Sequence, residues 1–407
     1  MLRRRGNTAK RIPEWLPLGL TLFALATVAC STRDTVAIEL CVSGEQCGDL
    51  LEFCAGQSAT SPGGGDDAPL CAGELAADTF RYALCGCADL DSNSEFTSDA
   101  FDSRDGPYQS GQSGGSIAVN GKVQSNRPMI IDGSLISAGE QGVHTSSVLT
   151  VTGDLHTGGD LGDPGAEVAA GGDVTVTGDI ALTSLSVGGA LTVPGDRTVA
   201  VADGEQVGEL VRAPVEVAEP CACSTEQHID VAAIVATHRT DNHNAALGID
   251  ADLLSDFRDD VELALDCGRF YFRRIQGQGS VTITVSGRTA IFVAENITLN
   301  RDLTIVVADG GLLDLFVAGQ INTSGAVAIG SPDSPAQVRV YVAGGGSINL
   351  SSGLTLAGNL YAPRTDLALS GDTEIFGAVF VNRMVSASPI TVHYDRAVST
   401  LAESCAD

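Results

Sequence analysis

A short motif that returns at nearly even intervals constrains the fold of this 407-residue chain more than any other feature. An aromatic residue followed by one or two small apolar residues recurs between about residues 281 and 394, and its copies begin at Phe292, Phe316, Tyr341, Tyr361 and Phe380. The successive intervals are 24, 25, 20 and 19 residues. Roughly 20 residues suit one turn of a β-helix, in which equivalent positions stack on each other. The motif therefore predicts a parallel β-solenoid with one internal aromatic ladder, because strands of a β-sandwich would give no reason for a motif to return in register.

A second repetitive region, between residues 116 and 211, consists of short alternating runs closed by glycine turns. The sequence LTVTGD at Leu149–Asp154 returns as VTVTGD at Val174–Asp179. Such alternation with a Gly-Asp ending is typical of short strands and tight turns. The chain is also rich in glycine, with 48 residues, and contains a single tryptophan, as repetitive β structure would. We predict an all-β fold, a β-solenoid of the right-handed parallel β-helix type in two stretches, residues 116–211 and 281–396.

The segments outside these two stretches differ from them in composition. We interpret residues 30–115 as a small Cys-rich, disulfide-stapled module followed by a polar linker. Residues 212–280 form a short mixed insert with three cysteines, in which Asp230 is expected to cap a helix that ends near Thr237. Residues 397–407 are a tail. We expect the insert and the tail to cap the ends of the solenoid.

The cysteine count indicates an exported protein. There are 11 cysteines, and ten remain when Cys30 is set apart. An even set in an exported chain predicts disulfides. Six of the ten lie between residues 41 and 87, where apolar content is too low for a good core, so cross-links there would replace missing burial. The pairing stays open. The candidates are Cys41, Cys47, Cys54, Cys71, Cys85, Cys87, Cys221, Cys223, Cys267 and Cys405.

The first 29 residues have the character of a targeting signal. Arginines and lysines precede an uncharged apolar run at residues 16–29, which is short for a membrane span. The run ends in Ala26-Thr27-Val28-Ala29-Cys30, which resembles the bacterial lipobox, with Thr27 in place of the usual Leu. The resemblance implies that residues 1–29 are removed and that Cys30 carries a lipid anchor. Ser31, rather than an Asp that would favour inner-membrane retention, points to the outer membrane of the cell envelope.

Two family resemblances follow from the repeats. Runs such as Leu149–Asp154 resemble bactofilins, which are polymer-forming cytoskeletal β-solenoid proteins; bactofilins are short, cytoplasmic and lack this set of cysteines. Residues 354–363, 375–379 and 393–395 resemble an uncharacterised C-terminal domain of pilus-assembly-associated and myxobacterial surface proteins. This second resemblance covers about residues 280–396. It implies a β-solenoid in a lipoprotein of myxobacterial type and carries no settled activity.

Candidate metal ligands are few. Asp89, Asp91, Asn93 and Glu95 alternate as in a calcium loop, but Ser94 replaces the glycine of the sharp turn, so a solvated acidic loop is favoured over a weak calcium site.

Three further residues, His238, Asp241 and His243, lie close together in the sequence. Their spacing in a loop does not by itself make ligands converge, and we interpret them as polar surface residues. His393 is expected to be a cap residue at the end of the last turn. We therefore predict no metal and no cofactor.

Catalytic motifs are equally weak. Residues 111–115 fit the pattern G-x-S-x-G, but they lie in a Gly/Ser-rich linker without a following helix, so they do not form a nucleophile elbow. Glycosidases need two carboxylates across one cleft. The acidic residues of the second stretch are scattered at turns and strand ends, so no pair is assigned; they are Asp314, Asp366, Asp372 and Glu374. We predict no catalytic residue and no enzyme activity.

The net charge of −28 and the absence of Lys/Arg clusters beyond the leader argue against nucleic acid as a partner. We predict a non-enzymatic surface lipoprotein with a structural or assembly role, whose partners are the membrane and either a second copy, through uncapped solenoid ends, or an envelope or pilus protein. The alternatives are an adhesin or binding module for polysaccharide or a pilus component, and a β-helix carbohydrate-active enzyme.

Overall fold

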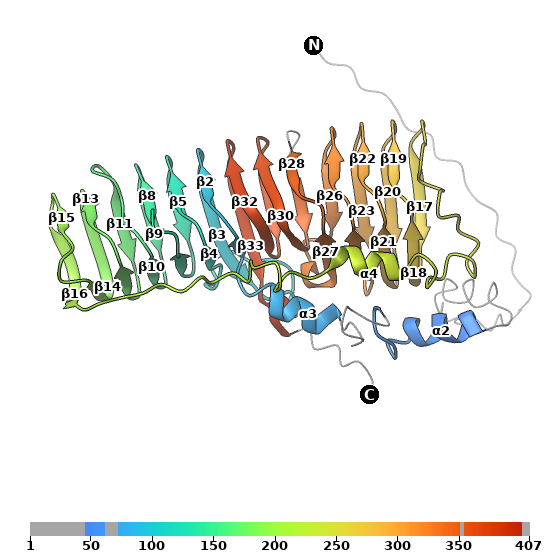
Figure 1. The fold of residues 1–407 in the computed structure, drawn as a ribbon, viewed down its shortest axis with the longest axis horizontal. Coiled ribbons are helices and arrows are strands. Elements are labelled where there is room, and N and C mark those ends of the chain that lie inside the picture. The colour runs from blue at the N-terminus through green and yellow to red at the C-terminus, as the bar shows by residue number, and fades with distance from the viewer. Residues whose placement is uncertain (1–44, 62–71, 351–353, 401–407) are drawn as a thin grey trace, which may run out of the picture.

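The structure, a computed structural model, describes residues 45–61, 72–350 and 354–400. It confirms the predicted fold: a parallel β-solenoid of about 14 turns between residues 117 and 393, with three disulfides (Figure 1). Cys30, together with the rest of the leader and residues 31–44, lies outside the described residues.

Most turns contribute one strand to each of three faces, and neighbouring turns pair in parallel and in register. Face 1 contains, in spatial order, β17 (Val261–Leu265), β20 (Val281–Val285), β23 (Leu303–Val307), β26 (Val327–Gly330), β29 (Leu354–Ala357), β31 (Thr373–Phe376), β33 (Ile390–Asp395), β3 (Phe96–Phe101), β6 (Met129–Ile131), β9 (Val148–Val151), β11 (Glu167–Ala170) and the first parts of β14 (Ser184–Val193) and β16 (Glu205–Arg212). Face 2 contains β18 (Gly268–Phe272), β21 (Arg288–Val293), β24 (Leu312–Val317), β27 (Val338–Val342), the first parts of β30 (Asn359–Leu369) and β32 (Val379–Ser386), β1 (Leu84–Gly86), β4 (Ile117–Val119), β7 (Leu135–Ser137), β10 (Leu155–Thr157), β12 (Val174–Val176) and the second parts of β14 and β16. Face 3 contains β19 (Ile275–Gly277), β22 (Ile297–Leu299), β25 (Ile321–Thr323), β28 (Gly346–Leu350), the second parts of β30 and β32, β2 (Leu90–Ser92), β5 (Val123–Ser125), β8 (Val143–Thr145), β13 (Ile180–Leu182) and β15 (Val199–Val201).

The two predicted stretches form one continuous solenoid, but in the reverse of their chain order. The second stretch occupies one end and runs to the middle, where β33 pairs with β3 and β32 pairs with β1 and β2. The first stretch then continues in the same direction to the other end (Figure 1). Residues 84–101 thus complete a turn at the junction, which corrects their assignment to the Cys-rich module and linker. Leu84, Leu90 and Phe96 are buried there, because they fill the interior between the two stretches.

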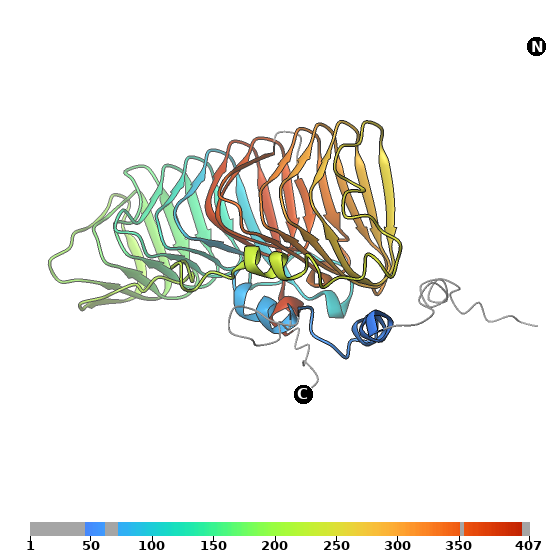
Figure 2. The same cartoon turned by 45° about the vertical axis from the view of Figure 1, so that its right-hand side comes forward.

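Residues 213–260, here called the strap, return along face 2 from β16 to β17 (Figure 2). The strap includes α4 (Val231–Thr237), and the Asp230 carboxylate accepts a hydrogen bond from the Ala233 N–H at 2.9 Å, so the predicted helix and its cap are confirmed. The predicted insert ends earlier than expected, because β17–β19 already form the first turn. The remaining helices are α2 (Glu45–Cys54), α3 (Ala72–Thr79) and the 3-10 turns η1 (Ser103–Asp105), η2 (Pro335–Gln337) and η3 (Arg396–Thr400).

The interior is built from columns of stacked side chains, one residue per turn. The first inner column of face 1 is apolar except for a buried threonine and for its last member, a glutamate at the end of the rod. Its members, in spatial order, are Val261, Val281, Leu303, Val327, Leu354, Thr373, Ile390, Phe96, Met129, Leu149, Val168, Leu185 and Glu205.

The recurrent aromatic residues stack in register as predicted, but on the outer side of face 2 rather than inside the solenoid. Phe292 and Phe316 are parallel with centroids 5.2 Å apart, and Phe316 and Tyr341 follow at 4.9 Å. The ladder continues in register to Phe380 and then to Cys85, which is disulfide-bonded to the strap. The prediction of an internal ladder is therefore wrong, because the aromatic side chains lie outside the solenoid. The aromatic rings form a second apolar layer between face 2 and the segments that cover it.

The recurrent Gly-Asp turns have a direct physical cause. The Asp154 carboxylate accepts a hydrogen bond from the Asp173 N–H of the next turn at 2.9 Å, and the Asp173 carboxylate accepts one from the Ala190 N–H at 2.8 Å. A Cβ on Gly172 would lie 2.1 Å from Oδ1 of Asp154. The residues before Asp173 and Asp179 must therefore be glycine, because the carboxylate of the preceding turn (Asp154 or Asp160) occupies the space that a side chain would need.

This packing yields a stability prediction. Replacing Gly172 by Ala forces its Cβ against the Asp154 carboxylate and should lower the free energy of unfolding by about 1–3 kcal/mol. Gly195→Ala is the matched control, because nothing lies within 4 Å of its Cβ position, and it should change the free energy by less than about 0.5 kcal/mol. Chemical denaturation of both variants measures the difference, and equal losses would contradict this account of the turns.

Candidate functional site

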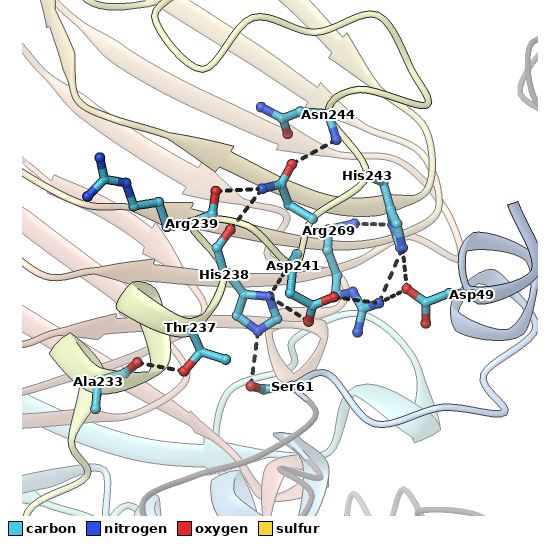
Figure 3. Close-up of polar contacts among 11 residues, drawn as sticks. Asp49, Ser61, Ala233, Thr237, His238, Arg239, Asp241, His243, Asn244 and Arg269 are labelled. Carbon is cyan, nitrogen blue, oxygen red and sulfur yellow. Dashed lines mark hydrogen bonds and ion pairs between the residues drawn. The ribbon is translucent and has the colours of Figure 1, made fainter. Parts of the chain in front are cut away.

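A polar cluster joins the N-terminal segment, the strap and face 2 near the first turn of the solenoid (Figure 3). We call it the clamp. Its members come from three parts of the chain that are distant in sequence. The N-terminal segment contributes Asp49 and Ser61, the strap contributes His238, Asp241 and His243, and β18 contributes Arg269.

His238 is placed by the end of α4 and by the aromatic ladder. It follows the last residue of α4, and its ring stacks on Phe292 with centroids 3.7 Å apart. Its Nδ1 lies 2.6 Å from the Asp241 carbonyl oxygen, which can only accept, so Nδ1 carries the proton. Nε2 therefore accepts the hydrogen bond from the Ser61 hydroxyl at 3.0 Å. The Asp241 carboxylate lies 3.6 Å from Nδ1.

The order serine, histidine, aspartate is that of a nucleophile, its general base and the group that orients the base. Two observations oppose that chemistry here. Ser61 and His238 are both fully buried at 0% exposure, so no substrate carbonyl reaches the hydroxyl in this conformation. Burial also lowers the pKa of the His238 imidazole to about 4, which leaves a weak base at neutral pH. The arrangement instead fastens Ser61 to the strap through a neutral histidine.

His243 and Asp49 form the other half of the clamp. The Arg269 N–H donates to Nδ1 of His243 at 2.9 Å, so Nε2 is the protonated nitrogen, and it donates to the Asp49 carboxylate at 3.0 Å. The Arg269 guanidinium also donates to that carboxylate. Burial alone would raise the pKa of Asp49, but the hydrogen bond from His243 and the charge of Arg269 bring it below its ordinary value. Burial lowers the pKa of His243 as well.

Aromatic and covalent contacts reinforce the same attachment. Phe53 of α2 is buried, with the Arg288 guanidinium 4.5 Å and the Arg269 guanidinium 5.5 Å from its ring centre. Arg288 also donates to the carbonyl oxygens of Phe53 at 3.1 Å and Ser58 at 2.9 Å. A disulfide between Cys54 and Cys267 closes the attachment. The segment 45–61 is thus held to the first two turns by charge, apolar packing and a covalent bond.

The other two disulfides, Cys85–Cys221 and Cys87–Cys223, fix the strap to β1 and the residue beside it. All three bonds connect the N-terminal part to the strap or to the first turn, so none of these three is a staple within residues 41–87. These three bonds lock segments onto an existing core. Cys47 is also disulfide-bonded. The predicted candidates Cys41, Cys71 and Cys405 lie outside the described residues.

The structure does not gather the calcium candidates around one point. The Asp89 carboxylate accepts from the Lys122 N–H at 3.1 Å, Asp91 pairs with Arg383, and Asn93 accepts from Asn126 at 2.7 Å. These residues belong to a turn and a strand at the junction of the two stretches. Within residues 45–61, 72–350 and 354–400, no group of three or more His, Cys, Asp or Glu is arranged to hold a metal ion.

The structure corrects the predicted environments of three histidines, His238 and His243, which were expected at the surface, and His393, which was expected to be a cap. His238 and His243 are buried, because the N-terminal segment covers a loop that would otherwise face solvent. His393 lies in β33 beside its register partner Asp99 of β3, with Nδ1 2.6 Å from that carboxylate, and Glu374 is 3.4 Å from Nε2. It is a buried link across the junction, not a terminal cap.

The scattered carboxylates and the G-x-S-x-G sequence remain apart. Asp314 is buried and accepts two hydrogen bonds from Arg339, at 2.6 and 3.0 Å, while Asp366 accepts from Asn382 at 2.6 Å. Ser113 is exposed in the segment between η1 and β4, and no helix follows it. The sequence reasoning missed Asp49, Ser61 and Arg269. The one local signal was the charge of Arg269 inside an otherwise aromatic strand, Arg269-Phe-Tyr-Phe272.

Residues 215–401 match DUF7305, a domain of unknown function. The matched region includes residues 215–260 of the strap and the whole second stretch, so the C-terminal part contains an uncharacterised domain, and that domain begins earlier than residue 280. The strap belongs with the turns whose aromatic ladder it covers. No curated protein and no solved structure matches the chain. Among the helices of the described residues, none is long and apolar enough to cross a membrane.

The neutral state of His238 gives a pH prediction. Its pKa is about 4 when folded and about 6.5 when unfolded, so unfolding takes up a proton between these values. The stabilising contribution is complete above about pH 6.5 and is lost as the pH falls toward 4, by roughly 3 kcal/mol in total. His238→Gln should flatten this dependence of the free energy of unfolding between pH 7 and 4.

His156→Gln is the control for that measurement, because His156 lies half-buried in β10, far from the clamp, and its loss should leave the slope unchanged. A slope in His238→Gln that equals the wild-type slope would show that the buried imidazole does not remain neutral.

Proposed function

We propose that this protein is a non-enzymatic, lipid-anchored protein of the outer membrane in which the solenoid serves as one rigid structural element. The observation that carries the proposal is the attachment of the N-terminal segment to the first turns, through Cys54–Cys267 and the Asp49–Arg269 ion pair. The sequence that leads from Cys30 to α2 ends at this attachment.

The mechanical argument is simple. An anchor at Cys30 would pull on α2 first, and α2 has only ten residues. Noncovalent contacts of so short a helix would open under load, whereas a disulfide transmits the load to Cys267, which directly precedes β18. From there it spreads into backbone hydrogen bonds that continue along the whole rod. Three disulfides also suit an oxidising compartment outside the cytoplasm.

A role without catalysis is supported by how the candidate groups are used. The Ser61–His238 hydrogen bond is buried beneath the N-terminal segment, and Asp314 is neutralised by Arg339. Each of these groups contributes to holding the fold.

The terminal turn bears on assembly. β16 places Glu205 in the inner column that Leu185 and Val168 fill in earlier turns, and Arg212 follows Val193 in another. Charged residues at inner positions of an edge strand oppose pairing with a further strand. We infer that the protein acts as a single rod. The charged residues of β16 prevent a further strand from pairing at this end of the solenoid.

Removing these charges tests that inference. Glu205→Leu with Arg212→Val should convert the end into an apolar edge, and residues 31–407 carrying both changes should associate in a concentration-dependent way in sedimentation velocity. Glu209→Leu adds a similar apolar group at an outward-facing position and should remain monomeric. End-to-end association of the wild-type chain at the same concentration would contradict the inference.

The anchor itself is tested in cells. In a Gram-negative host the wild-type chain should incorporate labelled palmitate and fractionate with the outer membrane, and Cys30→Ser should abolish the label. Ser31→Asp should keep the label but move the protein to the inner membrane. Wild-type chain without label, or label that persists in Cys30→Ser, would refute lipid attachment at this residue.

A further inference from the structure

We propose that a cavity between the strap and the aromatic ladder binds a small monocarboxylate, which is held by Arg364, Tyr361 and His228. This inference goes beyond the proposed function, because a rigid rod needs no ligand, and it does not depend on lipid attachment at Cys30.

The cavity lies where the strap crosses the end of β27 and the first part of β30. Its volume is about 200 Å³. An apolar cavity of about 150 Å³ is large enough for benzene, so this one has room for an acid of a few carbon atoms. Strap residues between 225 and 232 form one wall. The other wall consists of Val342, Ala343, Tyr361, Pro363 and Arg364.

Arg364 makes this cavity positive. The residue is exposed, and its guanidinium forms no ion pair or hydrogen bond with any residue that the structure describes. Burial lowers the pKa of His228, and the charge of Arg364 lowers it further. Burial raises the pKa of Tyr361, whereas the Ile229 N–H and the charge of Arg364 oppose that rise. The guanidinium therefore acts on both of the other polar groups at the cavity.

The charge balance selects a monoanion. Among the described residues that line the cavity, Asp230 is the other charged one, and its carboxylate accepts the N–H of Ala233 at 2.9 Å as the cap of α4. Asp230 is not among the charges that shift the pKa of His228 or of Tyr361. One positive charge thus acts in the inner cavity, and a dianion such as hydrogen phosphate would leave excess negative charge. A carboxylate neutralises that charge, and its two oxygens match the donors of a guanidinium.

Tyr361 offers a second donor. Its hydroxyl oxygen accepts a hydrogen bond from the Ile229 N–H at 3.0 Å, which fixes the phenol beneath the strap. Because burial raises the pKa of Tyr361, the oxygen keeps its proton at neutral pH. No residue in the described part of the chain accepts that proton. The hydroxyl can therefore donate to one oxygen of a bound carboxylate.

His228 offers a third donor. Both ring nitrogens are buried, and neither has a hydrogen-bond partner among the described residues. Buried polar atoms without a partner destabilise a fold. A half-turn of an imidazole about the Cβ–Cγ bond exchanges its nitrogens with its carbons within the same outline. In the proposed complex the ring makes this half-turn and its N–H donates to the carboxylate, while the apolar part of the acid packs against Val342 and Pro363.

Butyrate and its neutral counterpart butyramide test the site, by titration calorimetry of the full chain in a nonionic detergent. Butyrate should bind about tenfold more tightly, because only a carboxylate meets the charge of Arg364. Arg364→Gln should remove this preference. Arg301→Gln is the matched control, since it removes an equal charge from the exposed turn between β22 and β23, and it should keep the preference.

Four results of this titration would overturn the proposal. The wild-type chain would bind neither compound, would not distinguish them, or would bind inorganic phosphate more tightly than butyrate. The fourth result is a preference for butyrate that persists in Arg364→Gln.

His228→Phe separates a ligand-binding role of this residue from a structural one. Phenylalanine keeps a ring in place and removes the two unpartnered nitrogens, so the midpoint of thermal unfolding should equal or exceed that of the wild type. The affinity for butyrate should nevertheless fall about tenfold, because one hydrogen bond to the carboxylate is lost. Wild-type affinity in His228→Phe would exclude the histidine from the site.

Discussion

The structure depends on parallel backbone pairing at one place, the junction turn formed by β1–β3. These three strands pair with β32 and β33 on one side and with β4–β6 on the other. Side chains reinforce the same contact, because Asp99 meets His393 and Asp91 meets Arg383 across it. Without this turn the two stretches would be separate solenoids, each with an open edge at the junction. Every other arrangement, including the course of the strap, follows from joining them here.

The strap is the consequence of that arrangement, and it explains the aromatic ladder. A chain that must return from β16 to β17 crosses the outer side of face 2, and it needs an apolar surface on which to lie. The ladder supplies that surface over the second stretch, and His238 continues the stack by one ring onto Phe292. Where the ladder ends, at Phe380, disulfides from Cys85 and Cys87 take over the attachment. Packing and covalent bonds thus hold the strap over different parts of its course.

The sequence predicted those features whose causes are local. The β-solenoid follows from repeats about 20 residues long, and α4 follows from Asp230 and the apolar residues after it. The buried histidines were predicted to be exposed because the groups that cover them are remote: Ser61 is 177 residues from His238, and Asp49 is 194 residues from His243. The aromatic ladder was predicted inside the solenoid, but it lies on the outer side of face 2. Apolar residues alone do not distinguish the interior from an outer face that another segment covers. The pairing of residues 84–101 with 379–395 has no local signature at all.

The reversed spatial order of the two stretches has a consequence for biosynthesis. β1–β3 are made first, yet they obtain their neighbours β32 and β33 only after residues 379–395 have been synthesised. A solenoid built in chain order can add turns as they emerge, but here the edge of β1–β3 stays open until β32 and β33 are made. Parallel pairing over such sequence distances is slow, and an open strand edge is prone to aggregate meanwhile. Folding of the junction turn therefore waits for the synthesis of β32 and β33.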